Sequence, residues 1–510
     1  MTERIKCYLL NSLCRLLYQR EYQKFVRIKD LKKQQSAKLL EVLRKNEACI
    51  YGKKYSFHKI KNINEYQNSV PLTTYEDYLP FIEKIKNGEK NILTSEPVLL
   101  LEPTGGSTSA TKLIPYTKSL QAEFQKGLKP WLYDLYTQNP VLNWGKSYWS
   151  ITPATMQKKY TKAGLPIGFE EDSDYLGGLG KRLLKYVLVV PDEIVQEKNI
   201  AHFYQKTALA LLQCRNLTFI SIWNPTLLIL ILKYIEENLA GLLLDLPLQR
   251  RTEVEKYIEA KTYHKLWPHL KVISCWGDAH AHLYAQKLKG FFPQVYLQPK
   301  GVLATEGFIS FPLTGEKGAR LSLNSHFFEF ISPKNKQIYL AHELTQGQEY
   351  EVVITTSGGL YRYKLNDLIE VTGFQGPFPL LKFKGKRDKV CDLFGEKLHE
   401  DFLKNTMDSL GIKDVFYLFA PEGNSYVLYI QTEQLIPHDL DETLRMNFHY
   451  DYCRKLGQLQ AVKVFKLTGD PFPEYLRECV RRGQKLGDIK PTVLHLESGW
   501  DKVFTGKYIR

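Results

Sequence analysis

The sequence predicts a mixed α/β protein, with a large N-terminal domain and a smaller α+β C-terminal domain. Three observations support this. The 510 residues are 44 % hydrophobic and 25 % charged, which is a globular composition. Helix-like stretches alternate with short, buried strand-like runs through the first three hundred residues. The pattern then becomes β-rich from Gly301 to Phe374, and Gly376-Pro377 and Pro379 break it. We therefore place a domain boundary near residue 385, between domains 1–384 and 385–510.

The individual elements follow from periodicity and from turn residues. Helices are expected at residues 1–50, 119–136 and 200–214, and short helices alternate with turns over 60–91, where Pro71 and Pro80 act as breaks. Strands are expected at residues 218–222, 272–275, 350–356, 360–363, 415–419 and 426–430. The turn Ser357-Gly358-Gly359 separates two of these strands.

The N-terminal segment 1–54 is strongly basic. It holds 14 Lys/Arg and 5 Asp/Glu, a balance of +9 in a chain whose net charge is +15. An apolar stripe runs along it at helical spacing, formed by Leu9, Leu13, Leu16 and Leu17. Two interpretations stay open: a helix docked on the domain with its lysines in water, or a weak contact with an anionic membrane. No nucleic-acid-binding signature is present, so no nucleic-acid partner is expected.

The cysteines and the N-terminus favour a soluble, cytoplasmic protein. None of the eight cysteines forms a C-x-x-C pair, which favours core thiols of a reducing compartment over zinc ligands or disulfides. Met1 to Tyr8 shows no secretory pattern. The most apolar run, Phe219 to Leu232, contains Asn224-Pro225 and is too short to span a bilayer comfortably.

The segment Thr104-Gly105-Gly106-Ser107-Thr108-Ser109-Ala110-Thr111-Lys112 carries the clearest chemical signal. Its glycines let backbone N–H groups converge on an anion, its hydroxyls donate hydrogen bonds, and its lysine adds a mobile positive charge. It is not a Walker A loop, because no Gly-Lys-Ser/Thr closes it. From the residues alone, a phosphate cradle and an ordinary Ser/Thr loop both remain open.

Three weaker segments follow along the chain. Thr305-Glu306 can present a hydroxyl and a carboxylate to a nucleotide and its Mg²⁺, or can be an exposed strand end. Asp367 can accept hydrogen bonds from ribose hydroxyls, or can be a turn aspartate. Gly385-Lys386-Arg387-Asp388, followed by Gly395-Glu396-Lys397, can be a hinge or a basic linker.

The order and spacing of these four segments resemble the acyl-adenylate-forming superfamily. The chain more closely resembles the auxin-responsive Gretchen Hagen family of acyl-acid amido synthetases. The stretches that carry this resemblance are Tyr51-Gly52-Lys53-Lys54, Val70-Pro71-Leu72 through Tyr75-Glu76-Asp77, Ile85-Lys86-Asn87-Gly88-Glu89, and Thr355-Thr356 through Gly359-Leu360-Tyr361-Arg362-Tyr363. The resemblance runs from about residue 45 to the C-terminus.

The resemblance implies an ATP- and acyl-binding N-terminal domain, a mobile C-terminal domain, and ATP with Mg²⁺ as cofactors. The phosphate-loop positions it implies are Thr104, Gly106, Ser107, Thr108, Ser109 and Lys112. It also implies Thr305 beside the α-phosphate, Glu306 as the magnesium ligand, Asp367 on the ribose, Arg387 in the hinge and Lys397 reaching the adenylate. Two features depart from the family: Gly105 replaces the usual serine, and the hinge differs from that of plant members.

The implied reaction has two steps. A carboxylate attacks the α-phosphate of ATP and pyrophosphate leaves, which gives an acyl adenylate. An amine of an amino acid or another compound then displaces AMP to form an amide. No covalent enzyme nucleophile is needed. Two alternatives stay open, namely thioester formation with coenzyme A or a carrier protein, and a non-catalytic membrane-peripheral protein. Trp223 and Trp276 are candidates for the acyl pocket, or belong to the core.

Overall fold

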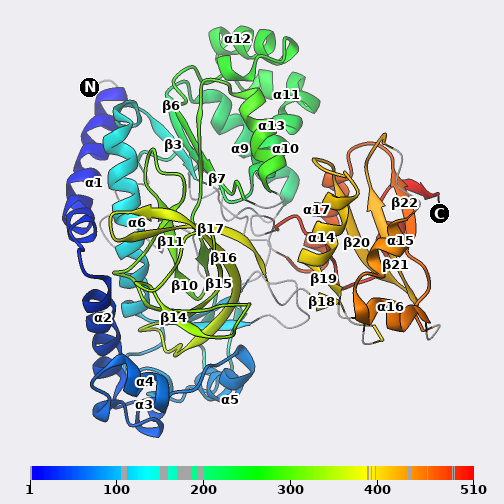
Figure 1. Cartoon of the computed structure of the whole chain (residues 1–510). Helices are drawn as coiled ribbons and strands as arrows, with labels where there is room; N and C mark the ends of the chain where they lie inside the picture. Colours follow the sequence, from blue (N-terminus) through cyan, green and yellow to red (C-terminus); the bar gives the residue numbers. More distant parts are fainter. Residues whose placement is uncertain are drawn as a thin grey trace. The chain divides into compact units, whose positions relative to one another are not determined.

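The protein is described here by a computed structural model, in which the chain forms two compact units (Figure 1). The first unit ends at Lys384 and the second begins at Gly385. The structure describes residues 3–104, 112–149, 159–168, 186–191, 194, 197, 199–278, 281–386, 390–391, 393–394, 396, 398–434, 439–455, 458–484, 486 and 489–509. Helices and sheets are mixed in both units, as predicted.

The helices of the first unit cover three sheets and a small hairpin. They are α1 (Glu3–Val26), α2 (Leu31–Asn46), α3 (Ile50–Lys54), α4 (Ile63–Ser69), α5 (Tyr75–Lys86), α6 (Lys118–Gln138), α9 (Ile200–Gln213), α10 (Pro225–Glu237), α11 (Leu239–Leu244), α12 (Leu248–Glu259) and α13 (Ala281–Phe291). The helical segments expected at 1–50, 119–136 and 200–214 are therefore confirmed, with the first divided into α1 and α2.

A parallel four-stranded sheet lies beneath α9, α10 and α13. Its strand order is β3 (Lys146–Trp149), β6 (Leu217–Ser221), β7 (Val272–Cys275) and β8 (Tyr296–Pro299). Strands β6 and β7 fall where buried strands were predicted, and every residue in both is buried. Because all four strands are parallel, their carboxyl ends gather along one edge of the sheet.

The β-rich region forms a seven-stranded sheet. Its order is β11 (Ser310–Pro312), β12 (Ala319–Leu321), β17 (Phe378–Lys386), β16 (Tyr363–Gln375), β15 (Glu349–Thr355), β13 (Phe327–Ile331) and β14 (Ile338–Leu340). Two smaller sheets complete the unit. They are β2 (Leu113–Tyr116), β1 (Leu100–Pro103), β5 (Pro166–Ile167) and β4 (Lys159–Tyr160), and the hairpin β9 (Leu303–Ala304) with β10 (Gly307–Phe308).

The second unit is built around its own four-stranded sheet and hydrophobic core. The strands run in the order β20 (Tyr417–Glu422), β21 (Ser425–Ile430), β22 (Lys463–Leu467) and β23 (Gly506–Tyr508), and a hairpin pairs β18 (Val390–Cys391) with β19 (Leu398–His399). Its helices are α14 (Glu400–Ser409), α15 (Leu440–Leu444), α16 (Phe448–Lys455) and α17 (Phe472–Arg481). The strands expected at 415–419 and 426–430 correspond to β20 and β21.

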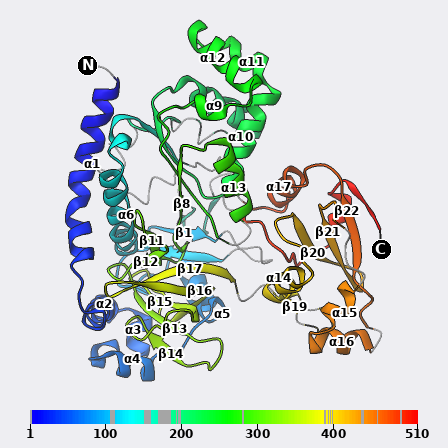
Figure 2. The ribbon, with the colours of Figure 1, turned by 45° about the horizontal axis from the view of Figure 1, so that its top comes forward.

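Helix α1 is docked on the first unit, but not through its leucine stripe. Figures 1 and 2 both show α1 lying alongside α6 at the outside of the unit. The docked face carries Cys7, Asn11, Cys14 and Tyr18, whereas Leu9, Leu13, Leu16 and Leu17 point to solvent. Asn11 Nδ2 donates to the carbonyl groups of Leu142, Asn143 and Gly145 at 3.2–3.4 Å. The docked face therefore combines buried side chains at helical spacing, which belong to the core of the unit, with the specific polar bonds of Asn11.

Three local expectations were wrong, and each reflects tertiary packing. Pro80 lies inside α5, which a Thr74–Asp77 capping box and a buried face stabilise despite the missing N–H. Pro379 lies within strand β17. Residues 360–362 are not a strand, because Arg362 takes a left-handed conformation with φ of 49° and pairing resumes only at Tyr363.

No helix within the described ranges is long and apolar enough to cross a membrane.

Candidate functional site

The predicted phosphate loop is closed at its base. Strands β1 and β2 form an antiparallel hairpin, and the Thr104 N–H donates to the Lys112 carbonyl at 2.9 Å. The expected ligands Gly106, Ser107, Thr108 and Ser109, with Gly105, lie outside the described residues. Thr104 and Lys112, which flank these positions, are held side by side by this bond, as a loop that surrounds an anion requires.

Lys112 extends from this base over the ring of Tyr75, with Nζ 5.8 Å from the ring centroid. The Tyr75 hydroxyl in turn accepts a hydrogen bond from the Leu113 N–H at 2.7 Å. Tyr75 is the first residue of α5 and belongs to one of the stretches that carry the family resemblance. The lysine is therefore positioned by an aromatic side chain more than thirty residues earlier in the sequence.

Thr305 and Glu306 form the two-residue turn of the β9–β10 hairpin, since Ala304 pairs with Gly307. The Tyr116 hydroxyl donates to the Thr305 carbonyl at 3.0 Å, which ties this turn to strand β2 of the loop hairpin. Glu306 is buried. The turn that holds Thr305 and Glu306 is thus joined directly to the hairpin at the base of the loop.

Electrostatics place Glu306 near two tyrosines of the same region. Burial, followed by the charge of Glu306, raises the pKa of Tyr363. Burial raises the pKa of Tyr75 as well, and Glu306 is one of the acidic groups that add to this effect. Tyr75, whose pKa Glu306 helps to raise, is also the residue whose ring lies beneath Lys112.

Asp367 lies in a bulge of strand β16. Pairing of β15 with β16 skips from Glu351–Leu368 to Val353–Lys364, and Asn366 has a φ of 59°. A bulge turns a side chain away from the regular alternation of a strand, and such bulges often lie beside functional sites. Asp367 itself is buried. The interpretation of Asp367 as a turn aspartate is therefore wrong, since Asp367 belongs to strand β16.

Two predicted residues, Arg387 and Lys397, and the neighbouring Asp388 lie outside the described residues. The position before Lys397 is nevertheless well anchored within the second unit. Glu396 is fully buried and accepts the N–H groups of Leu393 and Phe394, both at 2.8 Å, as well as the hydroxyl of Tyr426. The β18–β19 hairpin, which spans this segment, is thereby held against the core of its own unit.

Three of the four sequence stretches that carry the family resemblance contact one another or lie beside shared neighbours. The ring of Tyr51 stacks on Tyr361 with centroids 4.8 Å apart. The Tyr361 N–H donates to the Tyr78 hydroxyl at 2.7 Å, and Thr73 Oγ1 donates to the Tyr361 carbonyl at 2.8 Å. These residues are buried, so their role is to hold the Thr355–Tyr363 segment in place beneath the site.

A buried network around Glu123 was missed from the sequence. Glu123 accepts hydrogen bonds from Lys38, from His326 and from both the N–H and the hydroxyl of Ser357, at 2.6–3.2 Å. His326 Nε2 accepts the Phe308 N–H at 2.9 Å, so neutral His326 carries its proton on Nδ1 and donates it to Glu123. The network braces the hairpin of Thr305-Glu306 through β10. One signal in the sequence could have indicated this network: Lys38 is a charged residue on the mostly apolar face of α2, so it needs a buried partner.

Tryptophans gather at the carboxyl edge of the parallel sheet. Trp223 follows β6 and Trp276 follows β7, the Trp276 N–H donates to the Trp223 carbonyl at 2.8 Å, and their ring centroids lie 6.0 Å apart. Both side chains are partly exposed rather than buried in the core. Open α/β sheets bind ligands at this edge, which favours the pocket interpretation of these two residues.

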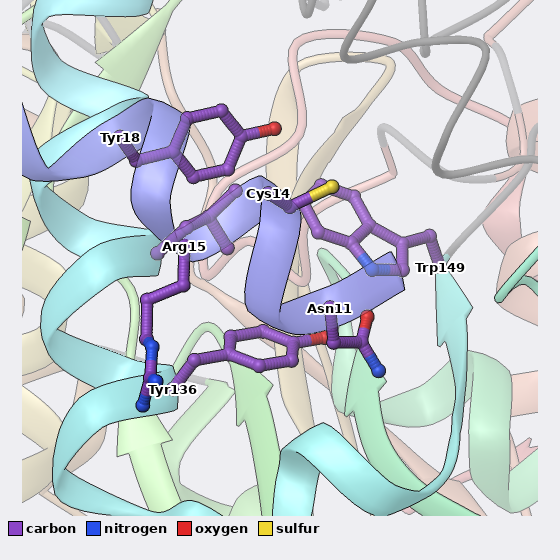
Figure 3. Close-up of a pocket in the computed structure, with 7 residues that line it drawn as sticks. Asn11, Cys14, Arg15, Tyr18, Tyr136 and Trp149 are labelled. Carbon is purple, nitrogen blue, oxygen red and sulfur yellow. The ribbon is translucent and has the colours of Figure 1, made fainter. Parts of the chain in front are cut away.

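A separate cavity between α1 and α6 is too small for a substrate (Figure 3). Its volume is about 20 Å³, room for a single water molecule. It is lined by Asn11, Cys14, Arg15, Tyr18, Leu132, Tyr136 and Trp149. Thr104, Lys112, Thr305, Glu306 and Asp367, the predicted site residues that the structure describes, do not line it. Within the described parts of the chain, no group of three or more His, Cys, Asp or Glu side chains could hold a metal ion by itself.

Comparison with known proteins gives a consistent result over most of the chain. The GH3 family N-terminal domain matches residues 22–252, the GH3 family central domain matches 320–386 and the GH3 family C-terminal domain matches 401–498. These are the domains of the Gretchen Hagen family that the sequence motifs resemble.

Individual relatives agree with this assignment. Jasmonoyl–L-amino acid synthetase JAR4 of Nicotiana attenuata is 23 % identical, over 88 % of this chain and 82 % of that protein. Indole-3-acetic acid-amido synthetase GH3.17 of Arabidopsis thaliana is also 23 % identical, over 86 % and 82 % of the two chains.

A solved structure supports the fold. AtGH3.15 acyl acid amido synthetase in complex with 2,4-DB superimposes with a TM-score of 0.80 at 18 % identity, covering 97 % of this chain and 95 % of that one. Domain matches, relatives and fold therefore lead to one conclusion: the chain belongs to the GH3 family.

Proposed function

We propose that this protein is an acyl-acid amido synthetase. It forms an acyl adenylate from ATP and a carboxylic acid, and then an amide with an amino acid or another amine, releasing AMP and pyrophosphate. The observation that supports this most strongly is the bond between the two hairpins, in which Tyr116 joins the Thr305-Glu306 turn to the base of the loop 104–112. The relatives named above are synthetases of the same kind.

The residues of this region fit ATP and Mg²⁺. A buried carboxylate and a hydroxyl in one turn are hard oxygen donors, which Mg²⁺ prefers, so Glu306 would hold the ion with Thr305 beside the α-phosphate. Bound Mg²⁺ would neutralise charge on the phosphates. On the protein side, Lys112 and the loop Thr104, Gly106, Ser107, Thr108 and Ser109 would hold the phosphates, and Asp367 the ribose.

The second unit would supply the remaining groups. We assign Arg387 to the hinge between domains 1–384 and 385–510, and Lys397 to the adenylate. Adenylation places negative charge around a crowded phosphorus, and a lysine directed at that charge stabilises the transition state more than the ground state. The anchoring of Glu396 supports this assignment, because it fixes the chain next to Lys397.

The decisive experiment is ATP–pyrophosphate exchange with indole-3-acetate, benzoate and dodecanoate, with and without Mg²⁺. Acid-dependent exchange is expected, and the fastest acid defines the acyl class. Absence of exchange with every acid, together with absence of ATP binding, would refute the proposal. A second screen of amino acids against coenzyme A then separates amide from thioester formation, and amide formation is expected.

A membrane-peripheral role is a second candidate, and the exposed face of α1 favours it. Leu9 is 53 % and Leu16 is 61 % exposed, and the surrounding segment 1–54 is basic. Apolar side chains beside cations match the surface of an anionic membrane. Flotation with phosphatidylserine vesicles tests it: a weak contact predicts binding that Leu9→Gln/Leu16→Gln removes, and no binding to these vesicles would refute it. A cytoplasmic location is part of the amido synthetase proposal.

A further inference from the structure

Lys300 occupies an unusual place at the carboxyl edge of the parallel sheet. It directly follows β8, and its Nζ lies 2.9 Å from the Oγ of Ser221, the last residue of β6. Strand β7 lies between these two strands. The lysine side chain therefore reaches across the end of the sheet, where ligands of open α/β proteins bind.

Two tryptophan rings flank the ammonium group. Nζ lies 4.9 Å from the ring centroid of Trp131 and 4.9 Å from that of Trp223. Trp131 is fixed in turn, because its indole N–H donates to Gln298 Oε1 at 2.9 Å. Trp276 packs beside Trp223 and extends the aromatic wall. We call Trp131, Trp223, Trp276 and Lys300 the edge cluster.

The charge of Lys300 lacks a protein counterion among the residues that the structure describes. Its polar contact there is the neutral hydroxyl of Ser221, and the titratable group that acts on its pKa is the thiol of Cys275 on β7. Burial raises the pKa of that thiol to about 12, so it is neutral at physiological pH. Burial lowers the pKa of Lys300 itself to about 7. A partly buried cation with aromatic and hydroxyl neighbours is suited to receive an anion.

We propose that Lys300 binds the carboxylate of the acyl substrate, while the tryptophans of the edge cluster contact the apolar part of that acid. The substrate class is then a flat, preferably aromatic, carboxylic acid. Lys300 stands five positions before Thr305, on the segment that leads from β8 into the β9–β10 hairpin. This inference rests on the proposed adenylation activity and identifies the residue that recognises its acid.

A lysine with a purely structural role makes different predictions. Replacement by an apolar side chain would then leave acid binding unchanged and alter only stability. The test therefore uses Lys300→Met and Lys300→Arg, and compares indole-3-acetate with its neutral amide, indole-3-acetamide. Binding is followed by the change in tryptophan fluorescence, and the KM for the acid by pyrophosphate exchange, from about pH 6 to about pH 9.

Lys300→Met should weaken acid binding at least about tenfold at pH 7, which is about 1.4 kcal/mol, and leave amide binding unchanged. Wild-type affinity for the acid should fall as the pH rises above about 7, by up to about tenfold per pH unit, as the lysine loses its proton. Lys300→Arg should keep acid binding and lose this pH dependence, because arginine stays charged.

The outcomes separate this inference from the proposed function. If the wild-type protein exchanges pyrophosphate but Lys300→Met keeps the wild-type KM for the acid, the role of Lys300 is refuted and adenylation stands. The same holds if Lys300→Arg retains the wild-type pH profile, a result that is informative even if Lys300→Met does not fold. If the wild-type protein shows no acid-dependent exchange, the proposed function itself fails.

Discussion

Lys38 Nζ lies 2.6 Å from Glu123 Oε1, and the side chains of both residues are 2 % exposed. Lys38 comes from α2 and Glu123 from α6, so the pair joins the N-terminal helices to the helix behind the candidate site. Burial alone would raise the pKa of Glu123, but Lys38 and the hydrogen bond from His326 lower it to about 2. The carboxylate is therefore charged at neutral pH and depends on its cation.

Replacing Lys38 by Met should destabilise the first unit by about 3–5 kcal/mol, because it leaves a buried carboxylate without its cation. Thermal unfolding of Lys38→Met measures this. The matched control is Lys45→Met, which breaks a partly exposed pair with Glu96 at 3.0 Å and should cost about 0–1 kcal/mol. Equal melting temperatures for the two variants would contradict the prediction.

The same pair predicts the direction of acid sensitivity. The folded-state pKa of Glu123 is lowered, so its contribution to stability is present at neutral pH and is lost as the pH falls from about 4.5 towards about 2. Lys38→Met should lose less stability than the wild type over this interval. Urea unfolding at a series of acidic pH values tests it, and parallel loss in both proteins would speak against the assignment.

Gly359→Ala should be more damaging than Gly315→Ala. Both glycines have positive φ, 99° and 86°, so alanine costs about 1–2 kcal/mol of backbone strain at either position. At Gly359 the added Cβ would also lie 2.7 Å from the Cβ of Leu93, whereas open space surrounds Gly315. Melting temperatures should therefore rank wild type above Gly315→Ala and Gly315→Ala above Gly359→Ala. The reverse order of the two variants would exclude the close packing at Leu93.

Asn11→Ala should destabilise the docking of α1, because it removes the donor to the carbonyl groups of Leu142, Asn143 and Gly145. Loss of hydrogen bonds at a buried site costs about 1–3 kcal/mol. Leu16→Gln is the control on the solvent face of the same helix, and it should change stability by less than about 0.5 kcal/mol. A larger effect of Leu16→Gln would mean that the leucine stripe is covered in solution.

Two variants test the proposed chemistry. Glu306→Gln should raise the half-saturating Mg²⁺ concentration at least about tenfold, since a neutral amide is a poorer ligand for a hard cation. Its control is Glu83→Gln, an exposed glutamate of α5.

Lys397→Ala should slow pyrophosphate exchange at least about 10²-fold, or about 2.7 kcal/mol. The control is Lys413→Ala, at an exposed lysine. An exchange rate within about threefold of the wild type would refute the assignment of Lys397 to the adenylate. An unchanged Mg²⁺ titration of Glu306→Gln would refute the assignment of Glu306 as the magnesium ligand.

Much of the fold was predictable because its signals are local. Apolar periodicity located the helices at 119–136 and 200–214, and short apolar runs located the buried strands β6 and β7. The errors arose where distant residues override local preference. Pro80 is tolerated in α5 because capping and burial stabilise that helix, and the left-handed Arg362 is held by two bonds to the carboxylate of Glu329, at 2.9 and 3.0 Å.

The features of the candidate site also fall into those that are recognisable in the sequence and those that appear only in the folded chain. The residue types that the chemistry requires, namely a hydroxyl-rich loop and a Thr-Glu pair, could be recognised in the sequence, because they depend on neighbours along the chain. Three relationships could be found only in the folded chain. Tyr116 joins the loop hairpin to Thr305, Glu123 binds Lys38, His326 and Ser357, and Lys300 lies between two tryptophans. These relationships join residues from different strands and helices, and packing rather than spacing brings them within a few ångströms of one another.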